Sequence, residues 1–306
     1  MSLFLDGVDD YAFAADHAAF KPTNAVTVMA WVKRGTGTTG ISPWIAGKVQ
    51  GADLYSYYLG QSATDTNHAS IVADTGGTTS LASASGLSTI VGNWTFMMAR
   101  WESGAANNIR IRRQGDGTDL ADVTSATVLT GPLRYDTKPF RIGANAAPST
   151  FYKGRIAHVG LWGRRLTDAE YLSLAGGANP QTVSGLLEYF PLLATGDTTG
   201  LIASNSLTLM GGAAFDADNP TVDTYTNADP ANLAVAVSGT QLTYTWDASP
   251  TPGVTTYSVC RRATGGTGNL SPATDEIARS ATSPYVETGV AAGSYDCQVF
   301  GVIPGA

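Results

Sequence analysis

Three aspartates crowd together near the start of the sequence, in the segment LFLDGVDDYAFAAD. Asp6, Asp9 and Asp10 would bring several carboxylate oxygens into one turn, and Ca²⁺ takes its protein ligands from oxygens of this kind. Aspartate is also a common turn residue, because its side chain accepts hydrogen bonds from the backbone that follows it. The segment therefore has two interpretations: a calcium site with these three residues as candidate ligands, or an ordinary turn.

Aromatic residues with amide and carboxylate neighbours form a second group of candidate functional residues. Sugar binding needs a ring on which the sugar can stack and polar groups beside that ring. The candidates are Trp44, Tyr55, Tyr57, Tyr58, Asn67, Asp74, Asn145 and Tyr152. Neighbouring residues of a strand point to opposite faces, so we expect at least one of Tyr57 and Tyr58 in the core. Packing in the interior is the alternative role for each of them.

The spacing of acidic residues argues against catalysis. A glycosidase needs two carboxyl groups about 5 to 9.5 Å apart across the sugar, which on one strand means acids at i and i+2 or i+4. The glutamates are each isolated: Glu102, Glu170, Glu188, Glu276 and Glu287. The histidines, at 17, 68 and 158, lack the spacing of a zinc site and are expected in loops or on the surface. We therefore expect no enzyme.

Composition indicates a turn-rich β protein. The 306 residues include 35 glycines, 43% are hydrophobic and only 14% are charged, a balance typical of short alternating strands. This length suits one large β domain and one small one.

Charge and cysteine content narrow the classes of partner. The net charge of −7 would repel a phosphate backbone, so we expect no nucleic-acid binding. No apolar run approaches the roughly 20 residues that cross a bilayer, so no membrane partner is expected. The N-terminus lacks a basic segment followed by an apolar core, so a signal peptide is expected to be absent or already removed. Two cysteines suit a reducing compartment.

One helix is clearly marked in the sequence. Thr167 stands at an N-cap position and Glu170, three residues later, completes a capping box. Leu166 and Tyr171 have the spacing of a hydrophobic staple, and glycines at 176–177 suit a left-handed C-cap.

Alternation predicts strands in most of the remaining chain. In 26–33, Val26, Val28, Ala30 and Val32 fall on one face and Met29 and Trp31 on the other. At the N-terminus, residues 3–13 are expected to form one strand that is interrupted at Asp6–Gly7. Further strands are predicted within 44–48, 55–60, 68–74, 93–101, 107–117, 140–162, 185–193 and 205–215.

Two of these segments carry a family resemblance. The opening LFLDGVDDY resembles the FDGVDDYV opening of laminin G-like domains, in the concanavalin A-like lectin and glucanase superfamily. A strand running into GRRLTDAEYLSLAGG resembles a signature near the end of those domains, and Trp94 matches a tryptophan between them. The resemblance implies a jelly-roll sandwich over residues 1–220. It also implies one calcium ion near the rim, but Ala157-His158 stand where the family often has two aspartates.

The C-terminal part resembles a different family. Residues 221–230 are polar and rich in turn formers, which indicates a linker. Residues 231–306 resemble a fibronectin type III domain, an immunoglobulin-like sandwich, with strands expected within 233–239, 241–248, 255–262, 283–290 and 293–302. In this resemblance Trp246 is the buried tryptophan and Tyr295 the corner tyrosine.

The strand register in this part leads to two expectations. Cys297 should point into the core and Cys260 outward, so the two cannot form a disulfide. A seventh strand beside 293–302 is missing, which would leave an apolar edge around Val299, Phe300 and Val302. Such an edge invites pairing with another chain, although closure within the chain is the alternative.

Together these patterns favour a non-enzymatic phage virion protein, on the tail or decorating the head. It would be made in the host cytoplasm and bind surface glycans. Its protein partners would be other virion proteins or neighbouring copies of the same chain, with which it would form a homo-oligomer. Two alternatives stay open. One is a structural decoration protein without a glycan ligand, and the other is a secreted accessory module of a glycoside hydrolase.

Overall fold

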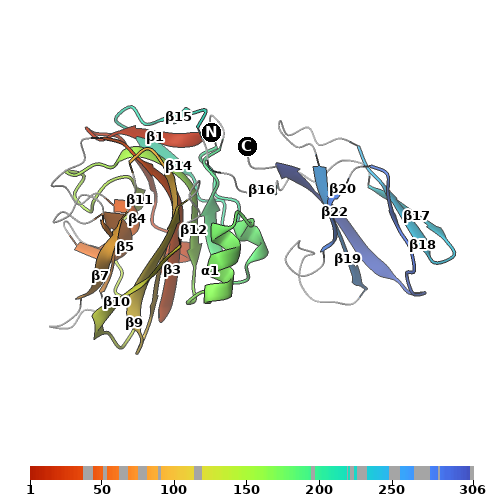
Figure 1. Cartoon of the computed structure of the whole chain (residues 1–306), viewed down its shortest axis with the longest axis horizontal. Helices are drawn as coiled ribbons and strands as arrows, with labels where there is room; N and C mark the ends of the chain where they lie inside the picture. Colours follow the sequence, from red (N-terminus) through yellow and green to blue (C-terminus); the bar gives the residue numbers. More distant parts are fainter. Residues whose placement is uncertain are drawn as a thin grey trace. The chain divides into compact units, whose positions relative to one another are not determined.

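The protein is represented by a computed structural model of residues 1–306, in which the chain forms two compact units. The first comprises 1–175 and 185–220, and the second comprises 176–184 and 221–306 (Figure 1). The structure describes residues 1–36, 44–50, 54–61, 68–74, 81–88, 91–113, 119–193, 197–218, 220, 224–225, 233–247, 256–264, 276–281 and 283–303.

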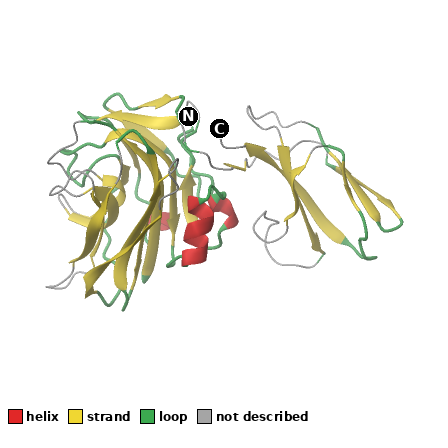
Figure 2. Cartoon of the chain, in the orientation of Figure 1, coloured by secondary structure: helices red, strands yellow, loops and turns green. Residues whose placement is uncertain are grey.

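The large unit contains two antiparallel sheets. The eight-stranded sheet has the order β10 (Asp119–Val128), β9 (Ala106–Arg113), β8 (Trp94–Glu102), β3 (Ala25–Arg34), β12 (Lys153–Trp162), β1 (Ser2–Asp6) and β15 (Ala214–Asp216), and β13 (Leu186–Phe190) also pairs with β12. The seven-stranded sheet has the order β14 (Leu207–Met210), β2 (Tyr11–Ala14), β11 (Phe140–Ile142), β4 (Trp44–Gln50), β5 (Leu54–Gln61), β6 (His68–Asp74) and β7 (Leu81–Ser88). The prediction of an all-β sandwich is confirmed (Figure 2).

Alternation along the strands produces the core between the two sheets. In β3 the four residues Val26, Val28, Ala30 and Val32 join the core, as expected. Met29 and Trp31 lie on the opposite face of the sheet. Burial of a valine side chain stabilises the fold by roughly 1.5–3 kcal/mol, so a shift of register by one residue would be strongly disfavoured.

The predicted N-terminal strand is in fact two strands in different sheets. β1 pairs with β12 in the eight-stranded sheet, whereas β2 pairs with β11 and β14 in the seven-stranded sheet. Gly7, at φ +83°, lies in the turn between them. The expectation of one interrupted strand is therefore wrong, because the turn at Asp6–Gly7 carries the chain from one sheet to the other.

The helix α1 (Asp168–Ala175) begins and ends where the sequence predicts. The Thr167 N–H donates to Glu170 Oε2 over 2.8 Å, and the Glu170 N–H donates to Thr167 Oγ1 over 3.2 Å, which is a capping box. Gly177, at φ +96°, follows the helix end. Two short 3-10 helices, η1 (Ala18–Phe20) and η2 (Pro180–Thr182), complete the described helical segments.

The helix α1 covers part of the outer face of the eight-stranded sheet. The Tyr171 ring lies 5.5 Å from the ring of Phe96 on β8, and Arg100 donates to Asp168 Oδ1 over 2.7 Å and to the Leu166 carbonyl over 3.0 Å. No described helix packs in this way against the outer face of the seven-stranded sheet.

The small unit contains a four-stranded and a three-stranded sheet. The first has the order β16 (Thr224–Tyr225), β22 (Tyr295–Ile303), β19 (Thr256–Ala263) and β20 (Glu276–Ala281), and the second has the order β17 (Ala234–Ser238), β18 (Gln241–Thr245) and β21 (Tyr285–Glu287). Trp246 is buried in its core, 5.3 Å from the Tyr257 ring. At the start of β22 the Tyr295 hydroxyl donates to the Ala291 carbonyl over 2.7 Å.

Neither cysteine forms a disulfide, as predicted. Cys297 packs against the small core. Cys260 follows Val259 of that core in β19, so it points to the opposite face of the sheet, where it is nevertheless fully buried. The predicted strand register is therefore confirmed, and it keeps the two sulfurs on opposite faces.

Candidate functional site

The outer face of the seven-stranded sheet carries a row of residues from four consecutive strands. Phe13 on β2 is the register partner of Arg141 on β11, and Arg141 is the partner of Gly47 on β4. Gly47 is in turn the partner of Tyr58 on β5. Register partners point to the same face, so these residues form one line across the sheet, which we call the outer-face row.

The sequence of β2 explains why aromatic rings face outward there. Ala12 and Ala14 are fully buried in the core, so Tyr11 and Phe13 must point to the other side of the pleat. Their ring centroids lie 6.3 Å apart. Phe151, in an isolated bridge with Ala144, adds a third ring, 6.2 Å from Tyr11. All three rings are half-buried and keep part of their surface accessible.

Trp44 and Tyr58 form a stacked pair at the other end of the row. Their ring centroids lie 4.8 Å apart with planes only 7° from parallel. A Cβ atom on Gly47 would come within 2.5 Å of Tyr58 Cβ and 3.0 Å of Trp44 Cε3. The pair therefore requires glycine at this position. Trp44 is buried, so the half-buried Tyr58 presents the pair to solvent.

Arg141 supplies the one charged group in the row. Its Nη1 donates to the carbonyl of Asn145 over 2.9 Å and to that of Ala146, and its guanidinium lies 5.8 Å from the centre of the Tyr11 ring. None of the ion pairs among the described residues involves Arg141, and its Nε is buried without an acceptor in that part of the chain. Burial lowers the pKa of Arg141, but arginine keeps its charge in proteins.

The predicted sugar-binding residues are only partly brought together. Trp44 and Tyr58 lie side by side, and Ala146, which follows Asn145, packs in the same cluster. The Asn145 side chain accepts from the N–H groups of Ser149 and Thr150 over 2.9 and 3.2 Å. The Asn145 side chain therefore fixes the turn of residues 145–150 beside the outer-face row.

The other candidates lie elsewhere. Tyr57 is in the core and its hydroxyl donates to the Phe20 carbonyl over 3.0 Å, as the opposite-face argument requires for one of the two tyrosines. Tyr152 also packs in the core, so packing is the role that the structure supports for it. Asn67 and the side chains of Tyr55 and Asp74 lie outside the described residues.

Sequence reasoning missed four members of this surface: Tyr11, Phe13, Arg141 and Phe151. A signal was present in β2, where aromatic residues alternate with alanines that fit a tightly packed interior. For Arg141 and Phe151 the signal is weaker, since only the pairing of β11 between β2 and β4 brings Arg141 into the row.

The three aspartates do lie together. One carboxylate oxygen from each of Asp6, Asp9 and Asp10 falls within 4.8 Å of the others. Asp10 Oδ2 accepts from the Asp6 N–H over 2.8 Å, and Asp6 Oδ1 accepts from the Val8 N–H over 2.7 Å. Burial raises the pKa of Asp10, and the charges of Asp6 and Asp9 add to that rise. Two oxygens thus serve the turn, while the crowding of negative charge suits a divalent cation.

Two of the isolated acids, Glu170 and Glu188, have structural partners in the large unit. Glu170 caps α1 and pairs with Arg164. Glu188 is buried and accepts from the N–H groups of Tyr189, Ile202, Ala203 and Asn205 over 3.0 to 3.2 Å, and from Asn205 Nδ2 over 2.6 Å. Both carboxylates are committed to the fold.

His158 differs from the expectation of a loop or surface histidine. It is fully buried in β12, at φ +51°, within the register shift between Ala157 and Gly160. Its Nδ1 lies 2.6 Å from the Tyr189 hydroxyl, and burial lowers its pKa to about 3. The expectation was wrong because alternation alone does not reveal a bulge that turns a polar side chain inward.

None of the described helices has the length and apolar character needed to cross a membrane. No curated protein gives a significant match to the chain.

Solved structures show low similarity. A candidate carbohydrate binding protein from Bacteroides ovatus has 11% identity and a TM-score of 0.47, covering 71% of this chain and 62% of that one. The enzymatically active domain of tailspike protein 2 from bacteriophage CBA120 has 13% identity and a TM-score of 0.44, covering 63% and 33%. The CBM40 of Ruminococcus gnavus IT-sialidase, bound to α2,3 sialyllactose, has 10% identity and a TM-score of 0.38, covering 56% and 96%. Each is too distant to support an argument about ligand or activity.

A family model gives a firmer result. The model described as concanavalin A-like lectin/glucanases superfamily (Laminin_G_3) matches residues 6–170, more than half of the chain. The match runs from the aspartate turn to the first residues of α1 and includes most strands of both sheets of the large unit. The chain therefore belongs to the concanavalin A-like lectin/glucanases superfamily.

Proposed function

We propose that this protein is a non-enzymatic glycan-binding protein whose binding surface is the outer-face row with the adjoining rings of Tyr11 and Phe151. The observation that carries the proposal is the line formed by Phe13, Arg141 and Tyr58 on a sheet face that no described helix covers. These side chains are half-buried, so they are held by packing yet accessible.

The chemistry of the row suits a sugar chain. The C–H faces of sugars stack on aromatic rings, and the sugar hydroxyls need donors such as a guanidinium. Neighbouring strands lie about 4.8 Å apart, so the three spacings from Phe13 to Tyr58 give a platform about 14 Å long. More than one sugar ring could lie along it. Because the strands fix the rings, little side-chain freedom would be lost on binding.

Calcium would have a supporting role. The carboxylates of Asp6, Asp9 and Asp10 fit a hard cation in charge and proximity. Burial raises the pKa of Asp10, and a cation there would relieve the repulsion from Asp6 and Asp9 that adds to this rise. The turn leads directly into β2, so an ion would stiffen the strand that carries Tyr11 and Phe13.

The setting that we propose is a bacteriophage virion, on the tail or decorating the head. Support comes from the sequence, in which a lectin-like domain is combined with only two cysteines. The small unit would then be a fibronectin type III-like docking domain. The hydrogen bond of Tyr295 with Ala291 supports this assignment, since it has the form of that family's tyrosine corner.

A broad glycan array, probed with the full chain with and without Ca²⁺, tests the binding function. We expect binding to at least one class of oligosaccharide. No binding under either condition would reject the proposal and favour a purely structural decoration protein. Mass spectrometry of purified phage particles tests the virion setting separately.

A further inference from the structure

Arg141 differs from two other arginines that also lie against aromatic rings. Arg155 donates from both Nε and Nη2 to the carboxylate of Asp216. Arg261 holds the carboxylate of Glu287 with the same two nitrogens, over 3.0 and 2.7 Å. None of the ion pairs of the described residues includes Arg141. Its positive charge therefore has no counter-ion in the described part of the chain.

The Arg141 guanidinium is only partly used by the fold. Its Nη1 donates to the carbonyls of Asn145 and Ala146, and the face of the group lies 5.8 Å from the centre of the Tyr11 ring. Its Nη2 donates to none of the described residues and, unlike Nε, is not a buried atom. The two carbonyls thus hold the guanidinium in place while Nη2 remains a donor for a ligand.

The strands around Arg141 carry no acidic residue. The consecutive strands β14, β2, β11, β4 and β5 have the sequences LTLM, YAFA, FRI, WIAGKVQ and LYSYYLGQ. Their one other charged residue, Lys48, is fully buried and paired with Asp16. The nearest acids before β2 are Asp9 and Asp10 of the aspartate turn. Although the net charge of the chain is −7, an anion on these five strands would meet a cation and no carboxylate from them.

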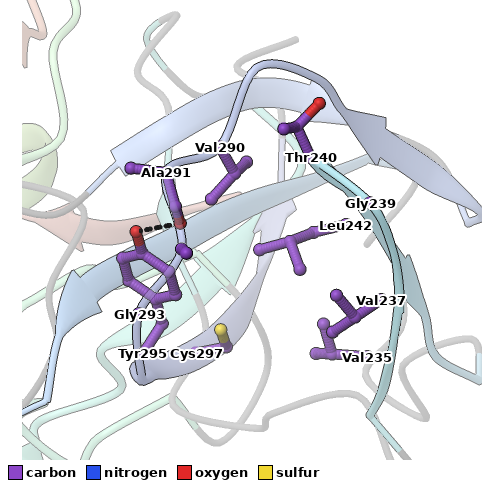
Figure 3. Close-up of a pocket in the computed structure, with 11 residues that line it drawn as sticks. Val235, Val237, Gly239, Thr240, Leu242, Val290, Ala291, Gly293, Tyr295 and Cys297 are labelled. Carbon is purple, nitrogen blue, oxygen red and sulfur yellow. Dashed lines mark hydrogen bonds between the residues drawn. The ribbon is translucent and has the colours of Figure 1, made fainter.

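A hollow in the small unit lacks such a charge. Its volume is about 460 Å³. Figure 3 shows Val235 and Val237 on one side of it and Tyr295 and Cys297 on the other. None of the described residues that line this hollow has an acidic or basic side chain. An anionic ligand would therefore have no counter-charge there, in contrast to the outer-face row.

We infer that the glycan bound along the outer-face row is acidic, and that an anionic oxygen of this glycan accepts a hydrogen bond from Nη2 of Arg141. Uronic and sialic acids carry such oxygens on a carboxylate, and sulfated sugars carry them on a sulfate. The inference rests on the proposed glycan-binding function and names the class of sugar. A hydrogen bond between two charged groups is roughly twice as strong as a neutral one, so the charge would contribute to affinity as well as to selectivity.

The position of Arg141 fits this role. In the row it lies one strand from Phe13 and two strands from Tyr58. The acidic group would thus be held in the middle of the platform, while sugar rings on both sides of it stack on the aromatic side chains. Arginine suits the task because its guanidinium is more weakly hydrated than an ammonium group and loses less on contact with a ligand.

A glycan array of matched pairs, probed with the full chain, tests the inference. One arm holds oligogalacturonates and sialylated oligosaccharides, each beside its methyl ester. A second arm holds carrageenan oligosaccharides beside their desulfated forms, so the two arms distinguish a carboxylate from a sulfate. We expect at least one acidic member to bind at least tenfold more tightly than its neutral counterpart. Added salt should reduce this preference, because it screens the charge pair.

Substitution of Arg141 should remove the preference. Arg141→Gln should bind the acidic and neutral members of a pair equally, and Arg141→Lys, which keeps the charge, should retain part of the difference. The matched control is Arg110→Gln, which removes the same charge from a half-buried arginine 4.4 Å from the Tyr171 ring. Arg110 lies on β9 in the other sheet, so this variant should keep the preference. Circular dichroism checks that each variant is folded.

The outcomes separate this inference from the proposed function. Equal binding of both members of every pair, or binding of neutral members alone, would overturn the inference and leave glycan binding intact. A preference that persists in Arg141→Gln, or that Arg110→Gln also abolishes, would overturn the assignment to Arg141. If Arg141→Gln does not fold, the wild-type chain decides, since a preference that salt does not reduce would overturn the inference. Binding to no glycan would reject the proposed function itself.

Discussion

At the scale of single residues, Glu188 shows how one buried carboxylate can organise a loop. Its two oxygens accept from four backbone N–H groups and one amide. A Cβ on Gly200 would come within 2.3 Å of the carboxylate, so the loop wraps closely around it. The sequence shows Glu188 only as an isolated acid, because its partners at 202–205 meet it through the fold.

Replacement of Glu188 by glutamine should therefore be costly. The amide NH₂ would face N–H donors, leaving at least one buried donor without an acceptor, and we expect a loss of about 2–4 kcal/mol in the free energy of unfolding. Urea denaturation measures it. Glu102→Gln is the control, since Glu102 is exposed at the end of β8. Similar small losses for both variants would contradict the role given to Glu188.

Glu170 makes a pH-dependent contribution to stability. Hydrogen bonding with Arg164 and with the helix N-terminus lowers its pKa to about 2. Because the folded pKa lies below the unfolded value, this stabilisation is complete above the unfolded pKa of about 4.3 and is lost as pH falls towards 2. We expect Glu170→Gln to destabilise the chain by roughly 1–2 kcal/mol at pH 7. The difference from wild type should shrink between pH 5 and pH 2, and a constant difference in urea denaturation would argue against this assignment.

The aspartate turn gives a third expectation at this scale. If the proposed calcium site is real, calcium at millimolar concentration should raise the Tm of the wild-type chain, because a ligand that binds only the folded state stabilises it. Asp9→Asn should abolish that rise, since Asp9 contributes one of the three clustered carboxylates. Differential scanning fluorimetry with Ca²⁺ and with Mg²⁺ measures both. A Tm that does not respond in the wild-type chain would leave the turn as the sole role of these residues.

At the scale of elements, the sequence was most informative where local chemistry decides the structure. The capping box of Thr167 and Glu170 predicts α1 correctly, since capping depends on residues within one turn. β3 was predictable because β-branched and small residues of one face alternate regularly with larger residues of the other along its length. β7, β10 and β20 were not predicted, because their residues are mostly small or polar. Such strands are stabilised mainly by their neighbours.

The element β4 depends on Gly47. A Cβ at this position would lie 2.5 Å from Tyr58 Cβ and 2.9 Å from the Tyr57 carbonyl, and neither atom belongs to the flexible end of a side chain. Gly47→Ala should separate Trp44 from Tyr58 and destabilise the fold by about 1–3 kcal/mol. Near-UV circular dichroism should report the loss of the stacked pair. An unchanged aromatic signal with unchanged stability would contradict the packing described for this element.

At the scale of the whole molecule, two properties differ in how well they follow from the sequence. The division into a large and a small β region, and the two-sheet sandwich, follow from composition, strand spacing and resemblance. The proposed binding surface does not, because Phe13, Arg141 and Tyr58 become neighbours only through the strand order β2-β11-β4-β5. That order joins distant segments of the chain, and no local pattern encodes it.

The central claim is that glycans bind along the outer-face row. The most direct measurement is the affinity of the best array ligand for the double variant Phe13→Ala/Tyr58→Ala, by isothermal titration calorimetry. The matched control is Phe4→Ala, because Phe4 is also half-buried and faces an arginine, Arg155, at 5.3 Å, but it lies on β1 of the other sheet. We expect the double variant to weaken binding at least tenfold and the control to leave it unchanged. Wild-type affinity in the double variant, or an equal loss in both, would contradict the account.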